Sequence, residues 1–257
     1  MYPGTQIGQK TGRSKLDLID AFIPTQSRPR LPSRPSAVIF DLDGTITDSK
    51  PGIVGCLRKV LEARQMKGWE PLDRFVGPPE AEWTAELLPE GSKDERATLA
   101  REYRSCYDRE GWKNNSVFAG VRDLLTGFNR MEIQLFVCTS KQQHFAVRVL
   151  DHFGLREFFE GIYGDNSEYL SHSKAELLAA LLLKQSIEKE SAIMVGDRIY
   201  DFEAARENGI RCIAAAWGYG SSNEYEMADA VALNPASLGH LLLPTDDAGP
   251  DPAYISS

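Results

Sequence analysis

The chain lacks the features that mark several classes of protein. Its four cysteines show no C-x-x-C spacing. Cys138 and Cys212 lie in apolar runs, so we expect them to pack in the core and not to bind metal or form disulfides. No apolar run approaches the roughly 20 residues of a membrane-spanning helix. The first ten residues, MYPGTQIGQK, have no apolar centre and do not resemble a secretory signal. A reducing, cytoplasmic setting and no membrane partner are therefore the expectation.

Positive charge is also scarce. Lys and Arg total 29 against 37 Asp and Glu, a formal net charge of −8, which argues against nonspecific nucleic-acid binding. Residues 1–36 are the exception, being basic, polar and rich in proline. We expect this segment to be a flexible leader, although residues 16–23 could form a short docking helix. Residues 244–257 are expected to form a C-terminal tail.

The most informative stretch is Asp41-Leu42-Asp43-Gly44-Thr45, directly after the apolar run 37–40. Such runs are typical of parallel strands that are buried on both faces. Asp41 and Asp43 are two residues apart, so on an extended chain they point the same way. Open α/β sheets bind ligands beyond the carboxyl ends of their strands. The stretch therefore predicts a site at the end of the first strand.

Strand-like and helix-like segments alternate along most of the chain. Strands are expected at 37–41, 133–138, near 162–163, at 192–195, at 212–215 and near 230–233, with helices between most of them. This alternation predicts a doubly wound, parallel-sheet α/β core of the Rossmann-like kind. Residues 52–116 contain helix-like segments only. We expect them to form a small all-α cap inserted into a core of residues 37–51 and 117–243.

Three further groups of polar residues stand where a site at this sheet edge would need them. Two of the groups follow expected strands, and the third opens a helix. Thr139 and Ser140 follow the strand at 133–138, and Lys174 opens a helix, where the helix dipole favours anions. A lysine in that place gains most by facing a phosphate. Asp197 and Asp201 lie four residues apart across a strand-to-helix turn. Asp201 could also cap the helix that begins there. Lys141 is expected to be a surface charge and His172 a loop residue.

The carboxylates that are expected to meet at the sheet edge would repel one another. Each pair about 4 Å apart costs about 4 kcal/mol at an effective dielectric constant of 20. A divalent cation would remove this cost, and oxygen ligands beside a phosphate favour Mg²⁺.

The ordered motifs resemble those of the haloacid dehalogenase-type hydrolases. Phe40–Ser49, FDLDGTITDS, is similar to the first motif of that family, Thr139 to the second, Lys174 to the third, and Gly196–Asp201, GDRIYD, to the fourth. The resemblance implies that Asp41 is the nucleophile and Asp43 the general acid/base. It implies phosphate binding by Leu42, Thr139, Ser140 and Lys174, and catalytic roles for Thr139 and Lys174. It implies Mg²⁺ held by Asp41, Asp197 and the Asp43 carbonyl, with Asp201 behind them.

Finer features resemble the phosphoglycolate phosphatase and 5′-nucleotidase branch. Trp217–Gly220 and Met194–Asp201 match its pattern, and Arg74–Pro79 is similar to its cap loop, so Arg74 and Gly77 are expected to face the substrate. The resemblance implies a Mg²⁺-dependent phosphatase of a small phosphorylated metabolite, acting as a monomer or homodimer. A phosphomutase with the same aspartyl-phosphate chemistry, and a non-catalytic regulatory protein on this fold, remain the alternatives.

Overall fold

The computed structural model describes residues 31–32, 34–166 and 173–243. His172, the tail at 244–257 and most of the expected leader lie outside these residues. In the part of the chain that is described, no helix combines the length and the apolar character needed to cross a membrane.

Six parallel strands form the main sheet, in the order β5-β4-β1-β6-β7-β8. The strands are β1 (Ala37–Phe40), β4 (Gln134–Gln142), β5 (Gly161–Asp165), β6 (Ala192–Gly196), β7 (Arg211–Ala215) and β8 (Ala230–Ala232). All four residues of β1 are buried, because the strand has neighbours on both edges and helices on both faces. The parallel sheet predicted from the sequence is confirmed.

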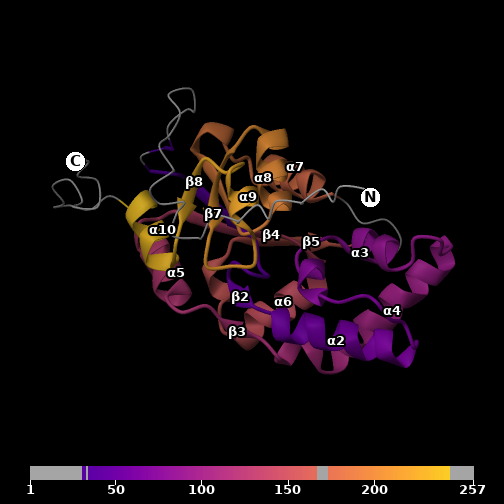
Figure 1. Cartoon of the computed structure of the whole chain (residues 1–257). Helices are drawn as coiled ribbons and strands as arrows, with labels where there is room; N and C mark the ends of the chain where they lie inside the picture. Colours follow the sequence, from indigo (N-terminus) through magenta and orange to yellow (C-terminus); the bar gives the residue numbers. More distant parts are fainter. Residues whose placement is uncertain (1–30, 33, 167–172, 244–257) are drawn as a thin grey trace, which may run out of the picture.

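Helices cover both faces of this sheet (Figure 1). Val38 and Phe40 of β1 point into one apolar cluster, which includes residues of α5 (Val121–Arg130), α6 (Gln143–His152) and α10 (Pro235–Leu242). Ala37 and Ile39 point into a second cluster, with α7 (Lys174–Lys184) and α8 (Ile199–Asn208). Alternate side chains of one strand thus pack against helices on opposite faces of the sheet, as a doubly wound fold requires.

The register of the sheet brings three strand ends together. Phe40, the last residue of β1, is level with Val137 of β4 and Val195 of β6. The chain adds β4 and β5 on one side of β1 and β6, β7 and β8 on the other. Such a reversal of strand order is where ligands bind in open α/β sheets. Residues 41–45 after β1, residues 138–142 at the end of β4 and residues 197–198 after β6 therefore lie around one point.

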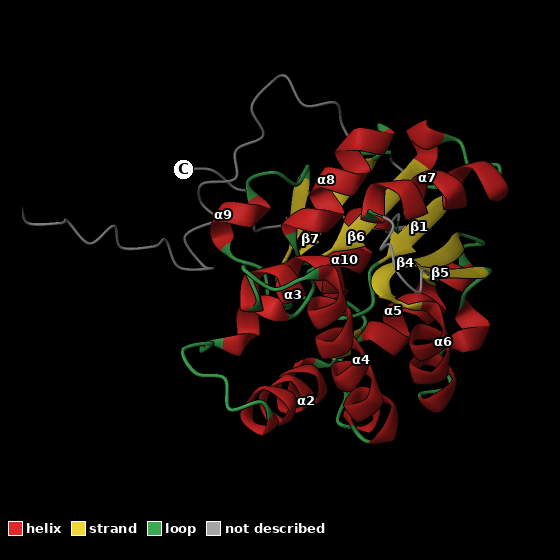
Figure 2. Ribbon diagram, turned by 90° about the vertical axis from the view of Figure 1, so that its right-hand side faces the viewer, coloured by secondary structure: helices red, strands yellow, loops and turns green. Residues whose placement is uncertain are grey.

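Residues 50–113 form what we call the helical layer. It contains α2 (Lys50–Ala63), η1 (Leu72–Phe75), α3 (Glu80–Leu87), α4 (Lys93–Arg109) and η2 (Gly111–Lys113). Figures 1 and 2 show α2 and α4 on the opposite side of the sheet from α7 and α8. Pro51 lies in the first turn of α2, where its missing N–H costs nothing, and Ser92 and Glu95 form a capping box on α4.

A short antiparallel ribbon connects the helical layer to the core. β2 (Thr47–Asp48) precedes the layer and β3 (Ser116–Val117) follows it, and the two strands pair with each other. The sequence analysis did not predict this ribbon, because two-residue strands carry no periodic signal. The remaining elements are η3 (Arg156–Phe158), η4 (Lys189–Ser191) and α9 (Ser222–Tyr225).

Candidate active site

A tight turn after β1 positions the first two carboxylates. The Leu42 carbonyl accepts hydrogen bonds from the amides of Thr45, Ile46 and Thr47, at 3.4, 3.0 and 2.9 Å. Gly44 has φ +91°, and a Cβ there would lie 2.3 Å from Asp197 Oδ2. A side chain at this position would therefore be strained and would also collide with Asp197. The turn keeps both Asp41 and Asp43 buried at the sheet edge.

Lys174 joins two of the predicted carboxylates. Its Nζ lies 2.7 Å from Asp41 Oδ1 and 2.5 Å from Asp201 Oδ1, and all three side chains are buried. A capping box between Ser173 and Glu176 fixes the first turn of α7, which carries the lysine. Burial opposes the lysine's charge, but Asp201 and Asp41 more than offset this and raise the pKa of Lys174. Lys174 is therefore a buried cation in the described structure.

Asp197 is fully buried beside this group. It accepts hydrogen bonds from the Tyr219 amide at 2.7 Å and from the Thr45 hydroxyl at 3.3 Å. Burial raises the pKa of Asp197 well above its usual value, and the charges of Asp41 and Asp201 add to this shift. Burial likewise raises the pKa of Asp41 to about 6, although Lys174 opposes the shift.

These groups fit a divalent cation. Asp41, Asp197 and Asp201 each place a carboxylate oxygen within 4.8 Å of the others. With Asp43 the site contains four carboxylates, and its two ammonium groups belong to Lys174 and Lys141. If all six groups are ionised, the site carries a net charge of −2. Asp201 Oδ1 is buried without a hydrogen bond of good geometry. An oxygen-ligated dication would match both the charge and the donor set.

Asp201 also has the capping role that its position suggested. Its Oδ2 accepts a hydrogen bond from the Arg198 amide at 3.0 Å, at the start of α8. This bond orients the carboxylate toward Lys174, so capping and site geometry are combined in one side chain.

The expectation for Lys141 was wrong. Its side chain is only 6% exposed, and its Nζ lies 2.8 Å from Asp43 Oδ2 and 2.9 Å from the Tyr107 hydroxyl. Burial opposes its charge, but Asp43 and Tyr107 raise the pKa of Lys141 overall. The sequence indicated a surface residue because the groups that surround this lysine come from the turn after β1 and from α4, both distant in the chain.

The hydroxyls predicted at the end of β4 lie beside the carboxylates. Thr139 is buried, and its Oγ1 accepts a hydrogen bond from the Lys141 amide at 3.3 Å. Ser140 Oγ and Asp43 Oδ1 are both buried without a protein hydrogen-bond partner. Buried polar atoms usually have a partner, so these two atoms indicate that a polar ligand completes the site.

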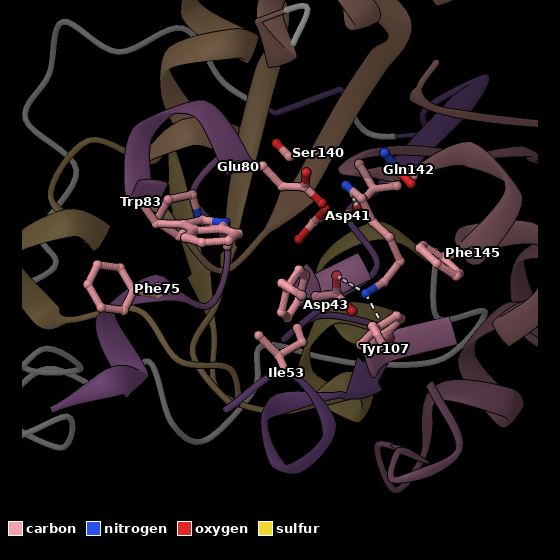
Figure 3. Close-up of a pocket in the computed structure, with 15 residues that line it drawn as sticks. Asp41, Asp43, Ile53, Phe75, Glu80, Trp83, Tyr107, Ser140, Gln142 and Phe145 are labelled. Carbon is pink, nitrogen blue, oxygen red and sulfur yellow. Dashed lines mark hydrogen bonds and ion pairs between the residues drawn. The ribbon is translucent and has the colours of Figure 1, made fainter. Parts of the chain in front are cut away.

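A pocket opens directly above these residues, between the helical layer and the sheet edge (Figure 3). Asp41, Asp43, Thr139 and Ser140 line its floor, and Gly77 lies in its wall with φ +106°. A Cβ at Gly77 would lie 3.0 Å from Arg198 Cγ, so the loop can approach the core closely only with glycine.

Arg74, which was expected to face the substrate, is not among the pocket residues. Its guanidinium pairs with Glu86 Oε1 at 2.7 Å and donates to the Pro71 carbonyl at 2.6 Å. These partners hold the side chain within the helical layer, away from the sheet edge.

Most residues of the pocket wall were not predicted from the sequence. Glu80, Trp83, Tyr103, Tyr107 and Phe145 line it. One available signal was the pair Tyr103 and Tyr107, which lie four residues apart on one face of α4. The direction in which that face points could not be known without the packing of α4 on α2 and α3.

The haloacid dehalogenase-like hydrolase family matches residues 38–215. Among curated proteins, tyrosine-protein kinase PtkA of Mycobacterium tuberculosis is 36% identical over 205 residues, which cover 79% of this chain and 69% of that protein. The 5′-nucleotidase of Pseudomonas aeruginosa is 33% identical over 215 residues, or 79% and 96% of the two chains. A phosphoglycolate phosphatase of Rhodospirillum rubrum is 31% identical over 222 residues, or 81% and 91%.

Solved structures agree with this assignment. A predicted phosphatase from Clostridium acetobutylicum superposes with a TM-score of 0.76 at 28% identity, covering 80% of this chain and 97% of that one. The structure of PtkA from Mycobacterium tuberculosis gives a TM-score of 0.70 at 33% identity, covering 82% and 99%. The family match extends over Asp41, Thr139, Lys174 and Asp197. The chain therefore belongs to the haloacid dehalogenase-like hydrolase family, as a phosphomonoester-hydrolysing enzyme of that family.

Proposed function

We propose that the enzyme is a Mg²⁺-dependent phosphatase of a small phosphomonoester, phosphoglycolate-like or nucleotide-like, and that it works through an aspartyl-phosphate. The observation that carries the proposal is the pairing of each carboxylate in the D-x-D motif with its own buried lysine. Lys174 contacts Asp41 and Lys141 contacts Asp43. Lys174 also contacts Asp201, whereas Lys141 also contacts the Tyr107 hydroxyl, so the two aspartates have different surroundings, as two different chemical roles require.

In this proposal Asp41 is the nucleophile. Lys174 holds one of its oxygens, and the other attacks phosphorus to form the aspartyl-phosphate. Lys174 and the Thr139 and Ser140 hydroxyls stabilise the charge on the phosphoryl oxygens. Mg²⁺, held by Asp41, Asp197 and the Asp43 carbonyl with Asp201 behind them, would supply further positive charge to the phosphoryl group.

Asp43 is the proposed general acid and base. It gives a proton to the leaving alkoxide in the first step, and in the second step it takes a proton from the water that attacks phosphorus. The helical layer is the proposed cap, covering the site and excluding water during the first step. Arg74 is not part of the proposed substrate site, whereas Gly77 remains in it.

Acid quenching with ³²P-labelled p-nitrophenyl phosphate and Mg²⁺ tests this mechanism, because the p-nitrophenolate leaves without needing a proton from Asp43. The wild-type enzyme should release inorganic phosphate. Asp43→Asn should accumulate label on the protein, because the second step lacks its base, and Asp41→Asn should carry no label. If the wild-type enzyme releases phosphate but neither it nor Asp43→Asn ever carries label, the aspartyl-phosphate mechanism is wrong.

A second candidate is transfer of the phosphoryl group to an acceptor other than water. The observation that favours it is the 36% identity to a protein named a tyrosine-protein kinase. The same aspartyl-phosphate would serve a phosphomutase, in which the acceptor is a sugar hydroxyl. Following the label separates these outcomes: it appears in inorganic phosphate for a phosphatase, in a second ester for a mutase, and on a tyrosine-containing acceptor for a kinase. No transfer to any acceptor would leave the non-catalytic alternative.

The setting and assembly are part of the proposal. We propose a cytoplasmic enzyme that acts as a monomer or homodimer on a free metabolite. Four free, buried cysteines support a reducing compartment. Cell fractionation and light scattering of the purified protein would test location and assembly.

A further inference from the structure

The wall of the pocket differs in chemistry from its floor. The floor carries the carboxylates and hydroxyls of the proposed phosphate site, whereas the wall contains the side chains of Ile53, Phe75, Glu80, Trp83, Tyr103, Tyr107 and Phe145. The wall is the part that would touch the alcohol portion of a phosphomonoester. Its composition therefore bears on the substrate.

Four rings of the wall form a continuous row. Trp83 and Tyr103 lie 5.3 Å apart at an interplanar angle of 74°, Tyr103 and Tyr107 lie 5.9 Å apart, and Tyr107 and Phe145 lie 5.1 Å apart at 78°. The row joins α3, α4 and α6, so it spans the helical layer and the core. An aromatic ring in the pocket can pack edge-to-face or offset-stacked against such a row, which is a favourable contact.

The charged side chain of the wall, Glu80, makes the wall unfavourable for an anionic group of the substrate. Glu80 enters the pocket from the same helix as Trp83 (Figure 3). Its carboxylate has one ion-pair partner among the described residues, Arg104, at 3.5 Å. Burial raises the pKa of Glu80 to about 7, with Arg104 opposing the shift, so this carboxylate would gain from a hydrogen-bond donor.

The pocket also lacks a spare cation among its described lining residues. Lys141 is the one lysine or arginine that lines it, and Lys141 is already paired with Asp43. Arg74 lies outside and is paired with Glu86. A substrate whose alcohol part carries a carboxylate would thus meet Glu80, and no unpaired lysine or arginine of the described chain lines the pocket to bind that carboxylate.

We infer that the alcohol part of the substrate carries an aromatic ring and a hydrogen-bond donor, and no second negative charge. This inference rests on the proposed phosphatase function. It selects between the two substrate kinds left open there and disfavours phosphoglycolate. The ring could be a nucleobase or a phenol, since both present a flat apolar face and a donor.

The ring enters only if the helical layer moves. The cavity measures about 60 Å³, which is room for a few water molecules. Contacts between the layer and the core hold it in this position: Tyr200 with Glu82 at 2.7 Å, Arg148 with Asp108 at 2.6 Å, and Lys141 with Tyr107 at 2.9 Å. The first two are exposed, so they oppose opening only weakly.

Matched alkyl phosphates test the inference. We would measure kcat/KM with Mg²⁺ for 2-phenylethyl phosphate, ethyl phosphate and 2-phosphoglycolate. All three lose an alkoxide, so differences among them report mainly on the alcohol part. We expect 2-phenylethyl phosphate to exceed each of the others by ten-fold or more. Equal or better turnover of 2-phosphoglycolate would overturn the inference while leaving the phosphatase function intact.

Two variants assign the preference to the wall. Trp83→Leu keeps an apolar side chain and should lower the ratio of 2-phenylethyl to ethyl phosphate by at least five-fold. Glu80→Gln removes the negative charge and should raise the relative turnover of 2-phosphoglycolate by at least five-fold. Arg74→Ala is the matched control, because its side chain lies in the same layer but outside the pocket. Unchanged ratios in folded Trp83→Leu and Glu80→Gln would refute the assignment.

A binding measurement separates failure of the inference from failure of the function. Calorimetry with Mg²⁺ would compare 3-phenylpropylphosphonate with 3-phosphonopropionate, neither of which can be hydrolysed. Tighter binding of the phenyl compound supports the inference even if no ester is turned over, and tighter binding of the carboxylate refutes it. Guanosine 5′-monophosphate and O-phospho-N-acetyltyrosinamide, compared as substrates, then distinguish a nucleobase from a phenol.

Discussion

Lys141 Nζ lies 2.8 Å from Asp43 Oδ2 and 2.9 Å from the hydroxyl of Tyr107. One ammonium group thus joins the proposed acid/base on the core to α4 of the helical layer. The Tyr107 contact can form only while the layer covers the site, so the surroundings of Asp43 depend on the position of the layer.

Lys141→Met should impair the enzyme most on esters with poor leaving groups. Without Lys141, the position of Asp43 is less fixed, and protonation of the leaving oxygen suffers. We expect kcat/KM for ethyl phosphate to fall by ten-fold or more, about 1.4 kcal/mol, and that for p-nitrophenyl phosphate to fall much less. Lys141→Arg should recover part of the loss.

The control for this variant is Lys67→Met, which removes an exposed lysine of the helical layer. It should leave both substrates unaffected. An equal loss on both esters in Lys141→Met would show that Lys141 acts on general stability and not on Asp43.

Asp41→Asn should abolish turnover and leave the fold intact. The amide cannot attack phosphorus, but Lys174 keeps Asp201 as a partner at 2.5 Å, and the cluster loses one of its repelling charges. We expect phosphate release below detection and a melting temperature in EDTA no lower than that of the wild type. Turnover by the folded variant would remove Asp41 from the nucleophile's role.

Metal removal should stop the reaction reversibly. EDTA is expected to abolish phosphate release and Mg²⁺ to restore it, whereas Ca²⁺ should restore little, because it takes more ligands at longer distances. Mg²⁺ should also raise the melting temperature, since binding only to the folded state stabilises it. The same rise should be much smaller in Asp197→Asn. Full activity in the chelator would contradict the proposed metal site.

Glu80→Gln should stabilise the protein at pH 8 but not at pH 5. Burial raises the pKa of Glu80 from 4.5 to about 7, so between these values the folded protein binds more protons than the unfolded chain. The stability contributed by this group therefore falls as pH rises through that window. A quarter of the side chain is exposed, 26%, which reduces the effect of the shift to about 1–2 kcal/mol.

Urea unfolding at the two pH values measures this effect. At pH 5 the protonated Glu80 and the glutamine are nearly equivalent, so the two proteins should unfold at the same urea concentration. An equal difference at both values would mean that the charge of Glu80 is not responsible.

The sequence predicted the parallel sheet because its strands are continuous apolar runs, such as 37–40 and 192–195. It also predicted that Asp41, Asp43 and Asp197 would meet, since each follows a strand whose carboxyl end lies at the same edge. These predictions needed only local patterns and a general rule of sheet geometry.

The surroundings of single side chains could not be predicted in this way. Lys141 was assigned to the surface, but Asp43 and Tyr107 bury it, and they lie 98 and 34 residues away in the sequence. Arg74 was expected in a loop that faces the substrate, but it lies in η1, and Glu86 and the Pro71 carbonyl direct its guanidinium within the helical layer. Such directions depend on tertiary partners, which no local pattern contains.

The paired strands β2 and β3 bring the chain into the helical layer and out of it at adjacent points. Asp41, Asp43, Thr139, Lys174 and Asp197 all lie on the core side of this crossing, while Glu80, Trp83, Tyr103 and Tyr107 all lie beyond it. The residues proposed to cleave the ester and most of those proposed to select the substrate therefore lie on separate stretches of sequence. A gene encoding this protein can acquire mutations that change its substrate without altering the residues that cleave the ester. The same crossing is the natural junction for an exchange of layers between related enzymes.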